Sequence, residues 1–402
     1  MNILEVIPSV DAASGGPIEW TRQFATAALR EGHNVEMASL DAPDAPCVRA
    51  FPLAVHACGP AKGLPYGYTP HFVPWMRRNA SRYDAVVVNG IWAYHSFGAW
   101  RALRNSRTPY FVFTHGMLDP WFKRRYPLKH LKKWLYWPWA EYRVLRDASA
   151  VLFTCEEEKI LARKSFWLYS ANEVTVGNGT SAPTGEAEAQ IEAFFLRSPA
   201  ARGKRIALFM GRIHPKKGCD LILDAFARIL GSDPAWHLVI AGPDDGGWQR
   251  ELMGQSADLG GRGRIAWPGM LTGDEKWGAM RAAEIFLLPS HQENFGLAVA
   301  EALACGVPAL ISSKVNIWRE VQQDGAGIVA ADDLEGTCAM LREWAGLTLE
   351  QRTRMRERAH GCFLQRFEIG KISHSLLELL ASTGSDRRVL RDTRNQATLA
   401  GA

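Results

Sequence analysis

Short apolar segments alternate with segments of helical periodicity along the first half of the chain, and this alternation limits the possible folds more than any other feature. The segments of strand length are Asn2–Ile7, Asn34–Leu40, Ala85–Val88, Tyr110–Phe113 and Ala150–Phe153. Residues 18–30 have helical periodicity, and Pro17 suits the first turn of this helix. Strands that alternate with helices are joined by crossovers, so we predict a parallel sheet with helices on both faces.

The same alternation restarts after a small, polar, proline-bearing stretch at residues 177–188. The later segments of strand length are Arg205–Met210, Trp236–Ala241, Ile285–Leu288, Ala309–Ser312 and Gly327–Val329. A length of 402 residues also favours two large domains. We therefore predict an α/β fold of two doubly wound, Rossmann-like domains that face each other across a cleft.

The composition shifts place the domain boundaries. We predict a first domain at residues 1–177, a linker at 178–190 and a second domain at 191–362. Residues 363–381 are expected to form a C-terminal helix that crosses back to the first domain. The remaining residues, 382–402, are polar and lack apolar periodicity, so we expect them to be disordered.

Composition and charge exclude several classes of protein. Hydrophobic residues make up 47% and charged residues 22% of the chain, which excludes a fibrous or mostly disordered protein. A net charge of +5 is too small to indicate nucleic-acid binding, but fits an anionic small substrate or a membrane surface. The seven cysteines are scattered without zinc-ligand spacing, which favours a reduced, cytoplasmic protein without a structural metal. We find neither a signal-peptide pattern nor an apolar run of about 18 residues that could span a membrane.

Ligands of parallel sheets bind beyond the carboxyl ends of the strands, so the loops that follow strands carry the functional information. In residues 211–218 two glycines flank Arg212, Lys216 and Lys217, just before a helix. Backbone amides at a helix N-terminus, an arginine fork and a lysine charge on one loop suit a diphosphate. A solvated basic turn is the alternative. The spacing of a Walker A loop is absent.

Two glutamates follow the predicted strand Ile285–Leu288. Glu293 precedes a predicted helix at residues 297–304, and Glu301 lies eight residues further on, among apolar residues. With helical geometry throughout, eight residues span about 12 Å, which is close to the extent of a sugar–diphosphate–ribose group. Glu293 would then accept hydrogen bonds from sugar hydroxyls and Glu301 from ribose hydroxyls, while the amides of Phe295, Gly296 and Leu297 face the phosphates. Two unrelated carboxylates are the alternative.

The first half supplies two further loops. Gly15 and Gly16 follow the first strand and precede a helix, an arrangement that lets backbone amides approach an anion. The spacing GxGxxG is absent, which argues against a nicotinamide enzyme. His115 and Asp119 follow the strand Tyr110–Phe113. A histidine at a strand end is by itself more often structural or exposed than functional.

The segments Gly211-Arg-Ile-His-Pro-Lys-Lys-Gly218 and Glu293-Asn-Phe-Gly-Leu-Ala-Val-Ala-Glu301 together resemble the retaining nucleotide-sugar glycosyltransferases of group 1, which are family 4 enzymes with the GT-B fold. The second segment matches the Glu-x7-Glu signature of that family in spacing and flanks. The resemblance implies that Arg212 and Lys217 hold the donor diphosphate without a metal or other cofactor. It also implies that Glu293 contacts the donor sugar and Glu301 the nucleotide ribose.

The resemblance extends to the first half of the chain. It implies that the loop with Gly15 and Gly16 closes over the phosphates. It places His115 near the reacting face of the donor sugar, where the side chain positions the sugar and stabilises developing charge. His115 and Glu293 are therefore the predicted catalytic residues, and Asp119 is a candidate carboxylate for the acceptor.

These inferences predict a retaining transferase that moves a hexose from a UDP- or GDP-linked sugar to a hydroxyl acceptor. A GT-B epimerase or sugar phosphorylase is a second possibility, but epimerases lack this arrangement of residues and phosphorylases are much longer and need a cofactor lysine. A non-catalytic two-domain sugar-binding protein is a third, although that class is usually exported. The residues do not identify the sugar, the acceptor or the oligomeric state.

Residues 121–146 (Trp121–Arg146) carry eight cations and one acid, Glu141, with four tryptophans among them. Cations attract anionic lipids and aromatic rings favour the headgroup boundary, so this stretch predicts peripheral binding to an anionic membrane. Such docking would bring the site after His115 to a lipid-linked acceptor, as in the synthesis of a surface polysaccharide. The alternative is a helix whose tryptophans pack inside the domain.

Overall fold

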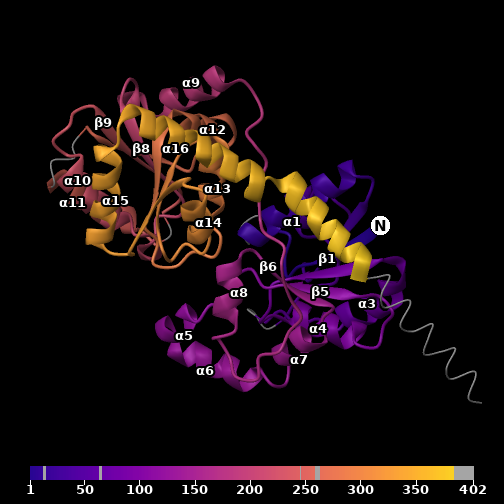
Figure 1. Cartoon of the computed structure of the whole chain (residues 1–402). Coiled ribbons are helices and arrows are strands. Elements are labelled where there is room, and N and C mark those ends of the chain that lie inside the picture. The colour runs from indigo at the N-terminus through magenta and orange to yellow at the C-terminus, as the bar shows by residue number, and fades with distance from the viewer. Residues whose placement is uncertain (12–14, 63–65, 245, 259–262, 384–402) are drawn as a thin grey trace, which may run out of the picture. The chain divides into compact units, whose positions relative to one another are not determined.

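The computed structural model describes residues 1–402 with the exception of 12–14, 63–65, 245, 259–262 and 384–402. The chain forms two compact units (Figure 1). Unit 1 contains Met1–Asn178 and the returning C-terminal segment from Ile369 onward, and unit 2 contains Gly179–Glu368. The expectation of a cleft between the two units stays a prediction.

Unit 1 is built on a seven-stranded sheet in the order β3-β2-β1-β4-β5-β6-β7, in which every neighbouring pair is parallel. The order reverses direction beside β1, which is the switch point of a doubly wound sheet. The strands are β1 (Asn2–Val6), β2 (Asn34–Ser39), β3 (Val55–Ala57), β4 (Ala85–Asn89), β5 (Tyr110–Phe113), β6 (Ala150–Phe153) and β7 (Glu173–Thr175).

Helices connect these strands, as crossovers between parallel strands require. They are α1 (Gly16–Arg30), α2 (Pro46–Ala50), α3 (Phe72–Asn79) with η2 (Ala80–Arg82), α4 (Tyr94–Leu103), α5 (Trp121–Arg125), α6 (Pro127–Tyr136), α7 (Glu141–Asp147) and α8 (Glu156–Ala162). A last helical segment, residues 369–383, ends the described part of the chain.

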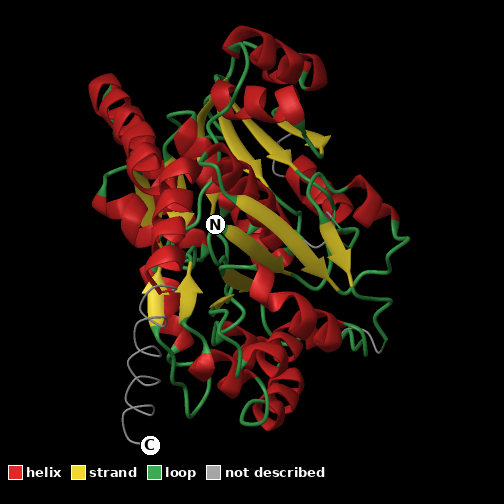
Figure 2. Cartoon of the chain, turned by 90° about the vertical axis from the view of Figure 1, so that its right-hand side faces the viewer, coloured by secondary structure: helices red, strands yellow, loops and turns green. Residues whose placement is uncertain are grey.

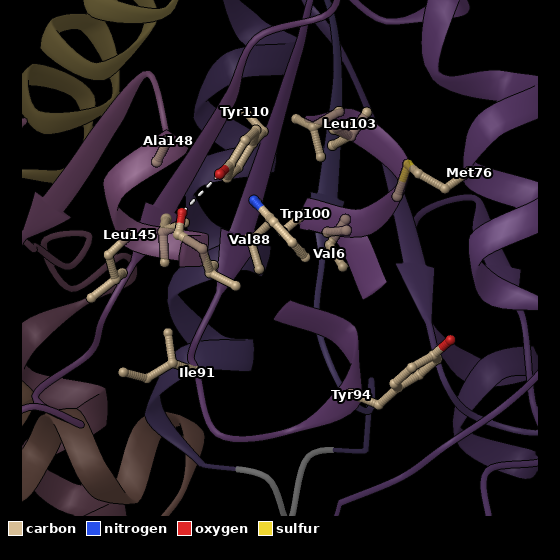
Figure 3. Packing of buried hydrophobic residues seen from close by; sticks show 14 of the residues in the cluster. Val6, Met76, Val88, Ile91, Tyr94, Trp100, Leu103, Tyr110, Leu145 and Ala148 are labelled. Carbon is tan, nitrogen blue, oxygen red and sulfur yellow. Dashed lines mark hydrogen bonds between the residues drawn. The ribbon is translucent and has the colours of Figure 1, made fainter. Parts of the chain in front are cut away.

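The sheet of unit 1 is buried on both faces, which explains why its central strands are apolar throughout. On one face Val88 and Tyr110 pack with Trp100 and Leu103 of α4, and the Tyr110 hydroxyl donates a 2.8 Å hydrogen bond to the Val144 carbonyl (Figure 3). Burial of each large apolar side chain contributes about 1.5–3 kcal/mol.

The other face is covered by α1 and by the C-terminal helical segment, although they lie at opposite ends of the sequence (Figure 1). Phe111 and Phe113 of β5 join Phe24 of α1 and Leu376 of residues 369–383 in one buried cluster. The end of the chain therefore completes the core of the first unit.

Unit 2 contains a six-stranded parallel sheet in the order β10-β9-β8-β11-β12-β13 (Figure 2). The strands are β8 (Arg205–Met210), β9 (Trp236–Ala241), β10 (Ile265–Gly269), β11 (Ala283–Leu288), β12 (Ala309–Ser312) and β13 (Gly327–Ala330). The helices are α9 (Ala187–Arg197), η3 (Pro199–Ala201), η4 (Pro215–Lys217), α10 (Cys219–Ile229), α11 (Trp248–Asp258), α12 (Gly273–Ala282), α13 (Leu297–Ala304), α14 (Trp318–Gln323), α15 (Leu334–Gly346), α16 (Leu349–Cys362) and the π-helical η5 (Phe363–Phe367).

Three strands escaped the sequence analysis, and all three are edge strands. β3 and β7 have three residues each and are only partly buried, so they carry no continuous apolar run. β10 contains Pro268 and Gly269 and its register with β9 is irregular. Edge strands are buried on fewer sides, so their sequences are less constrained.

The predicted limits of the second domain also differ from the structure. α9 begins at Ala187, so the last residues of the predicted linker are helical and pack against α12. Residues 363–367 form η5 within unit 2, and the helical segment that joins unit 1 begins at residue 369 rather than 363. The first two residues of the predicted disordered tail, 382 and 383, are helical, and the rest of the tail, 384–402, lies outside the described residues. No helix in the described part of the chain is long and apolar enough to cross a membrane.

Candidate active site

The candidate site of unit 1 lies where the strand order reverses. Glu5 is the fourth residue of β1, Asn89 ends β4, and His115 follows β5 by two residues. β1, β4 and β5 are consecutive in the sheet, so their carboxyl ends bring these side chains together. This is the edge of a doubly wound sheet at which ligands bind.

A chain of hydrogen bonds joins the three side chains. His115 Nε2 lies 2.9 Å from Asn89 Oδ1, and the Asn89 amide donates from Nδ2 to Glu5 Oε2. Burial raises the pKa of Glu5 to about 8, and the hydrogen bond from Asn89 opposes this shift. Desolvation lowers the pKa of His115 to about 3, so its imidazole is neutral at physiological pH. This part of the site is therefore uncharged around neutral pH.

The backbone around His115 is held by Glu158 of α8. Glu158 Oε1 accepts hydrogen bonds from Thr114 Oγ1 at 2.7 Å and from the Gly116 amide at 2.5 Å, while its other oxygen binds Thr154. His115 itself has φ = 47°, a left-handed conformation that costs a non-glycine residue about 1–2 kcal/mol. Ring stacking on Phe113, with centroids 4.3 Å apart, further fixes the imidazole.

The other predicted residues of unit 1 occupy neighbouring loops. Gly15 is the N-cap of α1, with φ = 81°, and Gly16 begins the helix; both are exposed. The residues just before them, 12–14, lie outside the described part of the chain. The Asp119 carboxylate accepts a 2.8 Å hydrogen bond from the amide of Trp121, the first residue of α5. This contact gives Asp119 a structural function, and the acceptor role predicted for it stays a prediction.

The candidate site of unit 2 is formed by the loops after β8 and β11, which also flank the switch point of their sheet. Gly218 brings these loops together, because a side chain there would place its Cβ 2.6 Å from the Pro289 carbonyl oxygen. The His291 amide also donates to the Lys216 carbonyl across the same contact, at 2.9 Å. Consequently Lys217 Nζ contacts Glu293 Oε2 directly.

The charge of this pair is shaped by its surroundings. Burial, together with the neighbouring cations Lys216 and Arg212, lowers the pKa of Lys217 to about 7. Glu293 favours the charged lysine, so the contact opposes that shift. Arg212 itself is exposed. The predicted diphosphate residues and the predicted sugar carboxylate are thus adjacent in space.

The second predicted glutamate has a partner that the sequence did not reveal. α13 begins at Leu297 after Gly296, whose φ is 77°, and Glu301 lies buried within it. Lys276 of α12 contacts Glu301 Oε1 at 2.7 Å. Because Glu293 precedes the helix, the helical rise applies to only part of the segment between the glutamates, and the predicted separation of about 12 Å does not hold as derived.

The residues before α13 fit their predicted position at its N-terminus. Phe295 is buried and packs edge-on against Phe367, with centroids 5.5 Å apart. The Glu293 backbone pairs with the segment after β12, through its amide to Lys314 and its carbonyl to Asn316. These contacts hold the first amides of α13 at the carboxyl edge of the sheet, where an anion can be bound.

The structure adds four residues that the sequence analysis missed: Glu5, Asn89, Glu158 and Lys276. Glu5 could have been noticed as a carboxylate within an apolar strand. Glu158 and Lys276 carry no local signal, because their functions depend on partners far away in the sequence. Among the described residues, no three histidine, cysteine, aspartate or glutamate side chains cluster as metal ligands, and all seven cysteines are free.

Both halves of the chain match known family models. Residues 190–360 match glycosyl transferases group 1, and residues 15–179 match the glycosyl transferase 4-like domain. Together the two models match most of the chain, which therefore belongs to the group 1 glycosyltransferases and has the GT-B fold, as predicted.

Curated relatives match about a third of the chain. A lipopolysaccharide core biosynthesis mannosyltransferase, LpsB, of Rhizobium meliloti is 33% identical over 139 residues, which are 33% of this chain and 39% of the relative. A phosphatidyl-myo-inositol mannosyltransferase of Mycolicibacterium smegmatis is 35% identical over 144 residues, or 35% of this chain and 36% of the relative. The matched parts thus span well under two thirds of these relatives.

Solved structures match nearly the whole chain. HepE of Anabaena in complex with UDP has a TM-score of 0.75 at 18% identity and covers 95% of this chain and 100% of its own. Sucrose-phosphate synthase of Thermosynechococcus elongatus has a TM-score of 0.74 at 19% identity, with 96% and 99% covered. These similarities establish the fold.

Proposed function

We propose that the protein transfers a hexose, with retention of anomeric configuration, from a UDP- or GDP-linked sugar to a hydroxyl of a lipid-linked saccharide. The observation that carries the proposal is the contact between Lys217 and Glu293 on two loops at the switch point of unit 2. It combines a cation for the donor diphosphate with a carboxylate for the donor sugar, beside the N-terminus of α13.

The chemistry follows from where charge develops. As the bond between the sugar and the diphosphate breaks, negative charge grows on the leaving diphosphate. Arg212 and Lys217 neutralise that charge, and the amides of Phe295, Gly296 and Leu297 at the start of α13 add hydrogen bonds. In this proposal the protein's own cations do the work of a metal, and no cofactor takes part. Glu301 accepts hydrogen bonds from the ribose.

His115 positions the donor sugar as a neutral group. The low pKa of His115 keeps its imidazole uncharged, so the side chain acts through hydrogen bonding and not as a general acid. The leaving diphosphate takes the proton of the acceptor hydroxyl. Gly15 and Gly16 at the start of α1 offer backbone amides to the phosphates.

The test is a donor screen. Each UDP- and GDP-sugar is added to the purified protein, and its stabilisation of the protein against thermal unfolding is measured. The donors that stabilise the protein are then incubated with a lipid-linked acceptor, and the release of free nucleotide is measured. Transfer with the anomeric configuration of the donor preserved, read by NMR of the product, supports the proposal. Inverted product, epimerised donor, or tight sugar binding without turnover would contradict it.

The proposal that the acceptor is lipid-linked depends on the surface of α6. Three leucines lie on one side of this helix and are exposed, Leu128 by 78%, Leu131 by 54% and Leu135 by 61%. Their spacing of three and four residues places them on one face. Exposed Lys129 and Lys132 flank this face. An apolar helix face bordered by cations fits the interface of an anionic membrane.

The sequence left two interpretations of the tryptophans in residues 121–146, membrane binding or packing inside the domain, and the structure contains tryptophans of both kinds. Trp137 is fully buried, whereas Trp139 is 70% exposed. Lys133 lies over the Trp92 ring at 4.5 Å, and burial lowers its pKa to about 8. Lys133 thus packs against the domain, while the three leucines of α6 are exposed to solvent. Relatives named for lipopolysaccharide core and phosphatidyl-myo-inositol chemistry also support a lipid-borne acceptor.

Vesicle sedimentation tests this surface. We expect binding to phosphatidylcholine vesicles that contain phosphatidylglycerol, weaker binding with added salt, and loss of binding in the double variant Leu128→Asp/Leu131→Asp. The matched control is Leu196→Asp/Leu349→Asp, which alters two leucines exposed on unit 2. Equal binding to neutral vesicles, or equal loss in the control, would contradict peripheral docking through α6.

A further inference from the structure

The buried carboxyl of Glu5 has no function in the reaction described so far. Glu5 and Asn89 are almost completely buried, at 0% and 1% exposure, in strands whose other inward side chains are apolar. Burying a carboxyl in such surroundings is unfavourable unless its hydrogen bonds compensate. Yet only Oε2 of Glu5 is bonded, to the Asn89 amide, and Oε1 has no hydrogen-bond partner in the described structure.

Asn89 is fixed on its other side as well. Its backbone carbonyl accepts a 2.9 Å hydrogen bond from Nε2 of the buried His95. Its side-chain Oδ1 lies 2.9 Å from His115 Nε2. The amide of Asn89 therefore has one end directed at Glu5 and the other at His115.

The orientation of that amide decides where the histidine carries its hydrogen. With Nδ2 donating to Glu5, the end facing His115 is Oδ1, which can only accept. His115 must then donate from Nε2, and in a neutral imidazole this leaves Nδ1 as the acceptor. A reversed amide would present Nδ2 to His115 and require the hydrogen on Nδ1.

We propose that Glu5 is a positioning residue that, through the amide of Asn89, holds neutral His115 in the Nε2–H tautomer. Nδ1 is then the ring atom able to accept a hydrogen bond from a sugar hydroxyl. This inference rests on the proposed function of His115 in binding the donor sugar. Glu5 itself touches no substrate, and it acts only through Asn89.

The tautomer is measurable without turnover. In protein labelled with 15N-histidine, the two ring nitrogens of His115, assigned with His115→Gln, have distinct resonances for protonated and unprotonated nitrogen. We expect Nε2 protonated in the wild type and in Glu5→Gln, whose amide oxygen replaces the acceptor. In Glu5→Leu, which keeps a similar volume, we expect a mixture of tautomers.

Kinetics supply the second measurement. Glu5→Leu should lower kcat/KM for the donor sugar by about tenfold, the loss expected from one misplaced hydrogen bond, with the affinity for free nucleotide unchanged, and Glu5→Gln should restore most of the rate. The matched control is Ile3→Ala, a buried residue on the same face of β1, which should leave the tautomer unchanged.

The outcomes separate this inference from the proposed function. A wild-type His115 protonated on Nδ1, or an unchanged tautomer in Glu5→Leu, would overturn the inference. An equal effect of Ile3→Ala on the tautomer would also overturn it, because the cause would then be general loosening of β1. Absence of transfer with every donor would instead contradict the proposed function, and the spectrum would still report the tautomer set by Glu5.

Discussion

The candidate sites of the two units lie at the same edge of their sheets, but they are built from different interactions. In unit 1 the groups at the switch point are Glu5, Asn89 and His115, joined by hydrogen bonds and uncharged near neutral pH. In unit 2 they are cation–carboxylate contacts, Lys217 with Glu293 and Lys276 with Glu301.

From this difference we expect the two units to bind different parts of the donor. Cations beside a helix N-terminus bind an anion through charge, so unit 2 is suited to the nucleotide diphosphate. Uncharged hydrogen-bonding groups in rigid backbone are suited to orienting a sugar, which has no charge to attract. The two sites should therefore respond differently to loss of a charge, to pH and to loss of a hydrogen bond.

The largest effect is expected from removing a charge of unit 2. Arg212→Ala and Lys217→Ala should each lower kcat/KM by on the order of 10²–10³, because each removes a group that stabilises the leaving diphosphate. Arg212 is exposed, whereas Lys217 is partly buried, so the two variants test the charge in different surroundings. Steady-state kinetics with Lys216→Ala as a same-loop control measure the effect. Activity within about threefold of wild type in both variants would remove this loop from the site.

A smaller effect should separate the two glutamates. Glu301→Gln is expected to weaken binding of free UDP or GDP by about tenfold, the value of one hydrogen bond to a charged group. Glu293→Gln should leave that binding unchanged and slow transfer. Isothermal titration calorimetry measures both.

The contact between Lys276 and Glu301 allows a purely structural explanation, which a double variant tests. If Glu301 serves only to pair with Lys276, then Lys276→Met combined with Glu301→Gln removes both charges and should restore nucleotide affinity. We expect no restoration, because the ribose contact is still missing. Restored affinity would show that the glutamate stabilises the fold alone.

In unit 1 the buried carboxyl predicts a pH-dependent stability. The pKa of Glu5 is about 8 in the folded protein, against 4.5 ordinarily. Between these values the folded state keeps a proton that the unfolded state has lost, so this group lowers the free energy of unfolding as pH rises, by up to about 1.4 kcal/mol per pH unit. Glu5→Gln removes this dependence.

Urea denaturation at pH 5, 6, 7 and 8 checks that prediction. The stability of Glu5→Gln relative to wild type should increase with pH across this range and level off above about pH 8. A difference that is constant with pH would mean that the carboxyl is already ionised in the folded state near pH 5.

The last prediction is that the ionisation state of His115 does not change near neutral pH. With a pKa of about 3, His115 should not titrate between pH 5 and 8, and the NMR shifts of its ring should stay constant in that range. A midpoint between pH 5 and 7 would contradict a neutral site in unit 1 and would remove the contrast between the units.

Much of this fold could be predicted because central parallel strands are buried on both faces. Tyr110–Phe113, Ala150–Phe153 and Arg205–Met210 were predicted with the bounds that the structure has. The edge strands β3, β7 and β10 were missed, since their short length, partial burial or irregular register leaves no continuous apolar run, whereas the edge strand β13 was predicted. The end of unit 2 was also misplaced, because η5 continues directly from α16 and nothing local marks the change of unit at residue 369.

The sequence by itself determined the alternation of strands and helices, the candidate functional loops and the chemical types on them, because these depend on local periodicity and spacing. Only the tertiary structure decided the partners. That Lys217 contacts Glu293, that Lys276 contacts Glu301, and that Glu5 reaches His115 through Asn89 depends on strand order, which brings distant residues to one sheet edge. Such pairings lie between 25 and 84 residues apart, beyond the reach of any local pattern.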